Sequence, residues 1–180
     1  MDKKHPAYQY AMDVAKGTVN APKYVKLQVK EFLNIANNKD RQYIIDDNKV
    51  RTIGELLKLL IMPKGLKANI TVYDAMAGFQ WFFITAILCT VERNNKDKRR
   101  YENAILEICR KNGKTFIIAI LFILLFFIEP KFSKFYSVAP DGSLSREIKT
   151  AIEEILRSSP AMLGKMNGKE KFKMLRDYIH

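Results

Sequence analysis

Cysteine and histidine are scarce in this chain, which excludes several kinds of site. Its 180 residues include two cysteines and two histidines. Cys89 and Cys109 both lie in apolar stretches with no histidine nearby. This predicts buried free thiols in a reducing compartment, and a zinc site is not expected. His5 and His180 stand at opposite ends of the sequence, so we expect solvated histidines and no histidine-centred catalysis.

Long apolar segments are also missing. No apolar segment follows the charged residues at the start of the sequence, so no secretory signal peptide is expected. The longest apolar run, residues 116–128, is shorter than the roughly 20 residues of a membrane-spanning helix. It is typical of a helix buried in an α/β core, and no membrane partner is expected. Membrane association through this run and its basic flanks stays as an alternative.

Acidic residues are the minority among the charged ones. The chain has 31 Lys and Arg residues against 19 Asp and Glu, for a net charge of +12. A basic chain attracts polyanions, so nucleic acid is a reasonable partner. The most concentrated charge lies in residues 93–100, which we interpret as a solvated connector, with contact to DNA phosphates as the alternative. A hydrophobic share of 48% favours a folded domain over disorder.

The apolar periodicity changes along the chain. It predicts helices over residues 5–16, from residue 24 onward, over 54–62 and over 73–91. A different order follows, in which short apolar runs alternate with longer ones. Strands are predicted at 103–109 and 134–139, and helices at 116–128 and 146–156. The alternation of strand and helix is typical of a parallel α/β sheet.

The segment Gly113-Lys114-Thr115 joins the first predicted strand to the helix that follows it. Such a loop presents backbone N–H groups and the positive end of a helix to phosphates. Glycine lets the backbone approach the phosphates closely, lysine reaches the β- and γ-phosphates, and the threonine hydroxyl can ligate Mg²⁺. The full P-loop pattern also has a first glycine, and Ile108 stands in its place. A structural turn is therefore the alternative.

Residues 109–115, Cys-Arg-Lys-Asn-Gly-Lys-Thr, resemble the divergent P-loop of the large terminase subunits of tailed phages. That motif typically lacks the first glycine. Three other segments resemble the family in the same order: residues 8–17 followed by 23–27, the stretch Phe79-Gln80-Trp81-Phe82, and residues 135–139 with the helix after them. The resemblance covers nearly the whole chain. It implies an α/β fold with a helical N-terminal region, residues 1–70, followed over residues 71–180 by the incomplete start of a P-loop NTPase parallel sheet.

The resemblance also implies a function, in which ATP hydrolysis drives viral DNA into a capsid. Arg110 and Lys114 correspond to the catalytic P-loop residues, and Arg110 senses or stabilises the γ-phosphate. Thr115 would hold Mg²⁺, and Gln80 would read the adenine edge of ATP. The implied cofactor-binding residues are Gln80, Arg110, Lys111, Asn112, Gly113, Lys114 and Thr115. Lys111 has a second interpretation as a solvated loop lysine.

Two parts of such a motor are not found in the sequence. No apolar strand ending in Asp-Glu, the family's Walker B motif, follows the P-loop, and no nuclease domain with clustered carboxylates is present. We therefore expect a fragment that binds ATP and hydrolyses it poorly. The implied partners are double-stranded viral DNA, the portal protein, the small terminase subunit and, at full length, further copies of the chain, in the bacterial cytoplasm. The alternative function is a non-catalytic basic module that binds DNA or protein.

Overall fold

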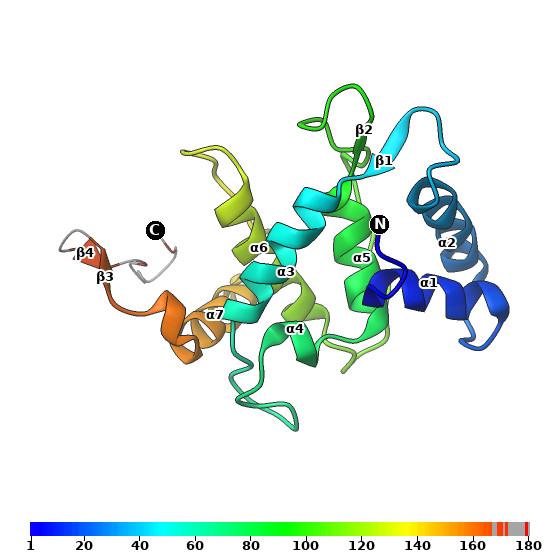
Figure 1. The fold of residues 1–180 in the computed structure, drawn as a ribbon. Coiled ribbons are helices and arrows are strands. Elements are labelled where there is room, and N and C mark those ends of the chain that lie inside the picture. Colours follow the sequence, from blue (N-terminus) through cyan, green and yellow to red (C-terminus); the bar gives the residue numbers. More distant parts are fainter. Residues whose placement is uncertain (167–168, 171, 173–178, 180) are drawn as a thin grey trace. The chain divides into compact units, whose positions relative to one another are not determined.

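A computed structural model describes residues 1–166, 169–170, 172 and 179 (Figure 1). The fold is mixed α/β, with seven α-helices and two antiparallel two-stranded sheets in the described residues. The chain divides into two compact units, residues 1–52 with 76–106 and residues 53–75 with 107–180. This division differs from the predicted boundary at residue 70, because residues 76–106 fold with the N-terminal helices.

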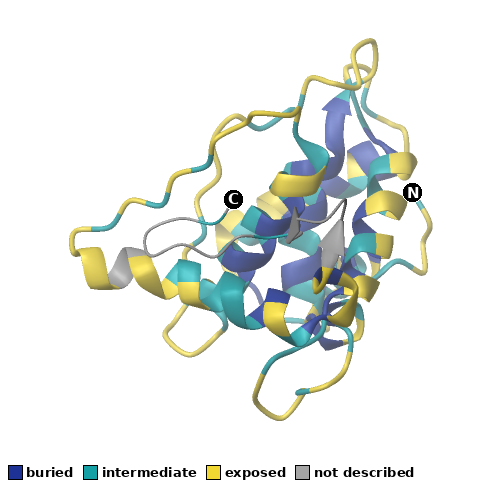
Figure 2. Ribbon diagram, turned by 90° about the vertical axis from the view of Figure 1, so that its left-hand side faces the viewer, coloured by how far each residue is buried: buried dark blue, intermediate teal, exposed yellow. Residues whose placement is uncertain are grey.

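Three helices build the first unit. Helix α1 (Pro6–Lys16) packs against both α2 (Lys23–Ala36) and α5 (Gly78–Cys89), as expected for helices with one apolar face. Helix α3 (Asp47–Leu59) begins in this unit and ends in the other. Figure 2 shows that the buried residues gather on helices. The apolar core of the unit includes Ala7, Ala11, Val14, Val29, Phe32, Ile35, Trp81, Ile84 and Leu88.

His5 is part of this packing. Its Nδ1 accepts a hydrogen bond from the Ala7 backbone N–H at 3.2 Å and so caps α1, and Pro6 occupies the first turn. The His5 ring meets the ring of Trp81 edge to face, with centroids 5.0 Å apart. Burial lowers the pKa of His5 below its ordinary value, opposed by the charge of Asp2. The prediction of a solvated histidine was therefore wrong for His5, and His180 lies outside the described residues.

A short sheet completes the first unit. Strand β1 (Tyr43–Ile45) pairs antiparallel with β2 (Thr90–Glu92), so that Ile44 lies opposite Val91. The chain then turns back on β2, because Glu92 N–H donates to Lys98 O and Arg100 N–H to Thr90 O. The basic run at residues 93–100 is thus a tight turn beside the sheet.

Gly78 marks the closest approach of α5 to α1. A Cβ atom at Gly78 would lie 3.1 Å from the Cβ of Tyr10, an atom that moves only with the backbone of α1. We therefore expect Gly78→Ala to lower the free energy of unfolding of this unit by about 1–3 kcal/mol. Gly142→Ala is the matched control, since Gly142 also begins a helix and a Cβ there meets nothing within 4 Å.

The measurement is urea unfolding, followed by tryptophan fluorescence for the first unit and by far-UV circular dichroism for the helices of both units. Trp81 is the single tryptophan and is buried in the first unit, so its emission reports on that unit. A midpoint for Gly78→Ala equal to that of the wild type would contradict the close helix contact.

The second unit contains the remaining helices. Helix α6 (Lys114–Ile128) packs against α7 (Gly142–Ser158). The other elements are α4 (Val72–Ala75), the 3-10 helix η1 (Pro160–Met162), and the paired strands β3 (Lys165–Met166) and β4 (Lys169–Glu170). The core includes Leu57, Leu60, Val72, Ile117, Ile120, Leu124, Ile155 and Leu156.

Ser159 is a buried polar link in the second unit. Its hydroxyl accepts a hydrogen bond from the Ile61 backbone N–H at 2.8 Å and donates to the Ile155 carbonyl oxygen at 2.6 Å. An ion pair between Lys64 and Glu154, at 2.7 Å, joins the same two segments. Together these contacts hold the loop after α3 against the end of α7.

Several predicted elements are confirmed. The run 116–128 forms most of α6, and residues 146–156 lie within α7, which begins earlier because Asp141 accepts a hydrogen bond from Ser143 N–H. The predicted helix at 73–91 is instead two helices, α4 and α5, followed by β2. No helix among the described residues has both the length and the apolar character needed to cross a membrane.

Both predicted strands of the parallel sheet are missing from the described fold. Residues 103–109 and 134–139 form no strand, and Ile105 and Val138 are each 92% exposed. A strand in a parallel sheet is stabilised by hydrogen bonds to its neighbours. Neither segment has such a neighbour in the described part of the chain, so both stay as exposed connections. The prediction that Cys109 is buried was wrong for the same reason.

Candidate functional site

Two residues of the loop before α6 have positive φ angles. Lys111 has φ 66° and Gly113 has φ 75°, both in the left-handed region. Gly113 is the N-cap of α6 and carries no side-chain cap. The first hydrogen bond of the helix runs from Ile117 N–H to the Gly113 carbonyl at 2.9 Å. The N–H groups of residues 114–116 therefore come before the first helical hydrogen bond, at the positive end of the helix dipole.

The side chains of this loop are basic and accessible. Arg110, Lys111 and Lys114 are all exposed, and Thr115 is half-buried. Asn112 folds back over the loop, with its amide nitrogen 3.4 Å from the carbonyl oxygens of Cys109 and Arg110. Three cations, a helix N-terminus and a hydroxyl group thus occur within six residues of sequence. This combination suits a ligand that carries several negative charges.

Gln80 and this loop belong to different units of the chain. Gln80 belongs to the first unit, whereas residues 110–115 belong to the second. Its side chain is buried, and its Oε1 accepts a hydrogen bond from the Ala77 backbone N–H at 2.9 Å. Gln80 therefore stabilises the start of α5. The six P-loop residues lie together because they are contiguous in the sequence.

Carboxylates that could bind a divalent cation are not clustered in the part of the chain that the structure describes. Among the residues whose side chains are described, no three His, Cys, Asp or Glu residues form a group that could hold a metal ion. Glu153 pairs with Lys149, and Glu154 pairs with Lys64. The sequence predicts Thr115 as the metal ligand, and this residue would supply a hydroxyl oxygen.

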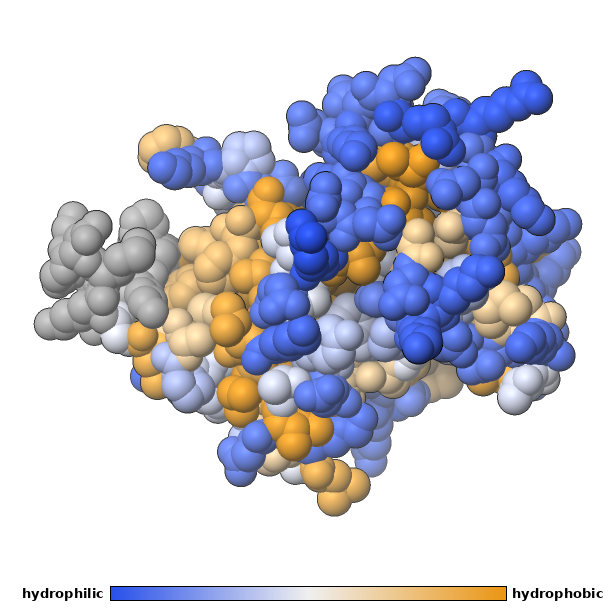
Figure 3. Space-filling view, in the orientation of Figure 1, coloured by the Kyte–Doolittle hydropathy of each residue, from blue (hydrophilic) through white to orange (hydrophobic). Residues whose placement is uncertain are grey.

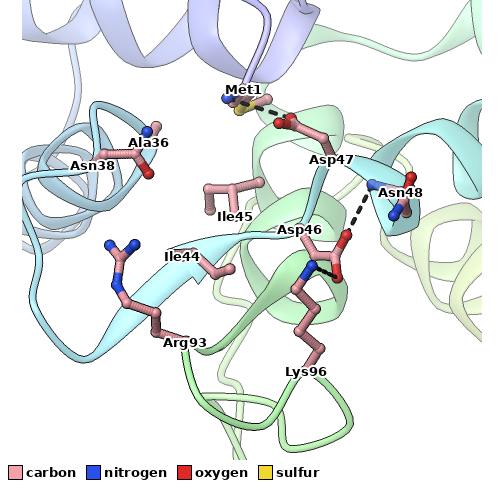
Figure 4. A pocket seen from close by; sticks show the side chains of 10 residues that line it. All are labelled: Met1, Ala36, Asn38, Ile44, Ile45, Asp46, Asp47, Asn48, Arg93 and Lys96. Atoms are coloured by element: carbon pink, nitrogen blue, oxygen red, sulfur yellow. Dashed lines mark hydrogen bonds and ion pairs between the residues drawn. The ribbon is translucent and has the colours of Figure 1, made fainter.

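A cavity of about 220 Å³ lies in the first unit, beside the start of α3 (Figure 4). Asp46 is buried there and caps α3 by accepting from Asn48 N–H at 2.8 Å. Its other oxygen is 3.9 Å from Lys96 Nζ, while Asp47 lies 3.3 Å from the Met1 ammonium group. Figure 4 shows the two carboxylates turned toward different partners. Each carboxylate forms an ion pair with a cation of the protein, and the two form no shared metal site.

The sequence did not predict these local roles, although a signal was present. An Asp before a helical run, as at Asp46, is a common N-cap, and an acidic residue such as Asp47 is favourable in the first turn of a helix.

Comparison of the chain with protein-family models, with curated proteins and with solved structures gives no match.

Proposed function

We propose that the loop at residues 110–115 and the N-terminus of α6 bind the triphosphate of ATP, as the nucleotide-binding part of a terminase-like DNA-packaging motor. The observation that carries the proposal is the left-handed backbone at Lys111 and Gly113, directly before a helix with an uncapped N-terminus. A helix N-terminus preceded by residues with positive φ can present backbone N–H groups to an anion, and this supports the proposal.

The side chains supply the remaining interactions. Lys114 would neutralise the β- and γ-phosphates, and Arg110 would reach the γ-phosphate with its forked donors. Lys111 and Asn112 would line the loop, and the Thr115 hydroxyl would ligate a Mg²⁺ ion that bridges the phosphates. All of these groups except Thr115 are exposed, so a nucleotide can approach them from solvent.

Adenine recognition by Gln80 is a further part of the proposal. Because its Oε1 is held by Ala77 N–H, its amide nitrogen would supply the donor for the base. Binding of ATP would then depend on Gln80, and Gln80→Ala would weaken ATP more than GTP.

The proposal includes the parallel sheet of P-loop NTPases: residues 103–109 and 134–139, which are unpaired in this structure, would become its first strands on pairing with neighbouring strands. Exposed apolar groups support it, since such a sheet would bury them. They lie on both unpaired segments and on α6, where Figure 3 shows apolar surface: Ile105, Phe126, Phe127, Tyr136 and Val138. We propose that this chain binds ATP with little hydrolysis of its own, since no apolar segment of residues 116–180 ends in Asp-Glu.

The proposed partners follow from the same assignment. They are double-stranded viral DNA, the portal protein and the small terminase subunit, in the cytoplasm of a bacterial host, with further copies of the chain at full length. The net charge of +12 supports the DNA partner.

Cys109 offers a direct test, because it is exposed and precedes Arg110. An alkylating reagent at neutral pH should modify Cys109 rapidly and leave Cys89 unmodified, since burial raises the pKa of the Cys89 thiol to about 12. Saturating Mg-ATP should slow alkylation of Cys109 several-fold by covering the loop. Mass spectrometry of the modified peptides measures both rates.

AMP, which has no triphosphate, is the matched control and should leave the rate unchanged. Equal Cys109 rates with and without Mg-ATP would argue against a nucleotide on this loop. Alkylation of Cys89 should appear only in denaturant, which provides an internal check that the protein is folded.

A further inference from the structure

Two groups of basic residues in the first unit differ in their partners. The group in residues 93–100 is largely engaged within the protein. Lys98 pairs with Glu92 at 2.7 Å, and Lys96 lies 3.9 Å from Asp46. Arg93 and Arg100 are engaged as well, Arg93 with the Asp40 carbonyl oxygen and Arg100 with Glu31 and the ring of Tyr43. This run, the densest charge in the sequence, therefore serves mainly the fold.

The lysines of α2 differ in this respect. Lys23, Lys26 and Lys30 are exposed, and none of them pairs with a carboxylate in the part of the chain that the structure describes. Their spacing of three and then four residues places them within about 60° of one another around the helix, over a length of about 10 Å. The other face of α2 is fixed in the core by Val29 and Phe32. The three lysines thus form one stripe on a rigid support.

We propose that this lysine stripe binds the phosphate backbone of double-stranded DNA. Each strand of a duplex carries one phosphate per 3.4 Å of axis, so a stripe of about 10 Å spans about three phosphates. The acidic residue of α2, Glu31, is neutralised by Arg100 and does not repel the DNA. The choice of DNA as the nucleic acid rests on the proposed function.

An anionic membrane is the competing partner for a basic helix. Helices that lie on membranes insert a broad apolar face. The apolar face of α2 is instead buried in the protein. Elsewhere on the helix, Tyr24 and Leu27 are the exposed large hydrophobic residues. The surface around α2 is mostly hydrophilic in Figure 3. The stripe therefore fits phosphates arranged along a duplex better than a lipid surface.

The test measures binding of the whole chain to a short fluorescent DNA duplex at several salt concentrations. Replacing Lys23, Lys26 and Lys30 together by alanine should flatten the slope of log affinity against log salt by about 2.7, because each lost phosphate contact removes about 0.9. Binding at low salt should weaken at least about tenfold. The control replaces Lys3, Lys4 and Lys131, which are exposed and carry the same total charge, and should keep most of the wild-type slope.

Three results would overturn the assignment. They are no binding by the folded wild-type chain, equal flattening in both triple variants, and binding to phosphatidylserine vesicles through the same lysines without binding to the duplex. Trp81 fluorescence confirms that each variant is folded. Protection of Cys109 by Mg-ATP, measured on the same proteins, separates this surface from the nucleotide site, because either can fail while the other holds.

Discussion

Lys114→Ala is expected to weaken Mg-ATP binding by about 10- to 100-fold, the largest effect on binding that we predict. A charge-assisted hydrogen bond contributes about 1.5–3 kcal/mol, and each 1.4 kcal/mol corresponds to a factor of ten in the dissociation constant. Lys114 is exposed and is the first residue of α6, so its removal should leave the fold intact. Titration with a fluorescent ATP analogue in the presence of Mg²⁺ measures the change.

Lys134→Ala is the control, because Lys134 is exposed in the same unit and carries the same charge. It should change the dissociation constant by less than about twofold, as expected for a distant, screened charge. Lys114→Arg keeps the positive charge and should bind between the wild type and Lys114→Ala. Equal weakening in Lys114→Ala and Lys134→Ala would mean that ATP binding depends only on the net charge of the protein, and it would contradict a specific phosphate site.

Local signals in the sequence predicted helices well. Gly17 ends α1 with φ 82°, a conformation that glycine adopts without strain. The apolar residues of α2 recur on one face, and that face is buried. Such signals act within a few residues, so they are readable without knowledge of the rest of the fold.

Strands were harder to predict because their stability comes from distant segments. The apolar run at 103–109 resembles a buried strand, yet a strand needs a paired neighbour, and the described residues supply none. The two strands of the first unit, at residues 43–45 and 90–92, are three residues long and were not predicted. Their pairing joins segments that are far apart in the sequence, a contact that local periodicity cannot indicate.

The candidate site divides in the same way. Gly113-Lys114-Thr115 was recognisable because the loop, its glycine and the helix after it are contiguous, and the structure gives that glycine the expected positive φ. The partners of single side chains were not recognisable. Gln80 caps its own helix, and the basic run at 93–100 pairs with carboxylates from three other segments. The lysines of α2 are accessible instead, and there the sequence shows only regularly spaced lysines.

Phe32→Ala is expected to lower the free energy of unfolding of the first unit by about 3–5 kcal/mol, the cost of deleting a large buried aromatic side chain. Phe32 is 3% exposed and meets the ring of Phe82 edge to face, with centroids 5.0 Å apart. The variant would leave a cavity where α2 joins the core. Urea unfolding followed by Trp81 fluorescence measures the loss, since Trp81 lies in the same unit.

Tyr24→Ala is the matched control, because Tyr24 is an aromatic residue on the same helix and is 76% exposed. Its effect should stay within about 0.5 kcal/mol, as for other surface substitutions. A small loss in Phe32→Ala would mean that α2 is not held by its apolar face, and the lysine stripe would then lack the rigid support on which DNA binding depends. A large loss confined to Phe32→Ala would establish α2 as part of the core, with its lysines presented to solvent on the opposite side.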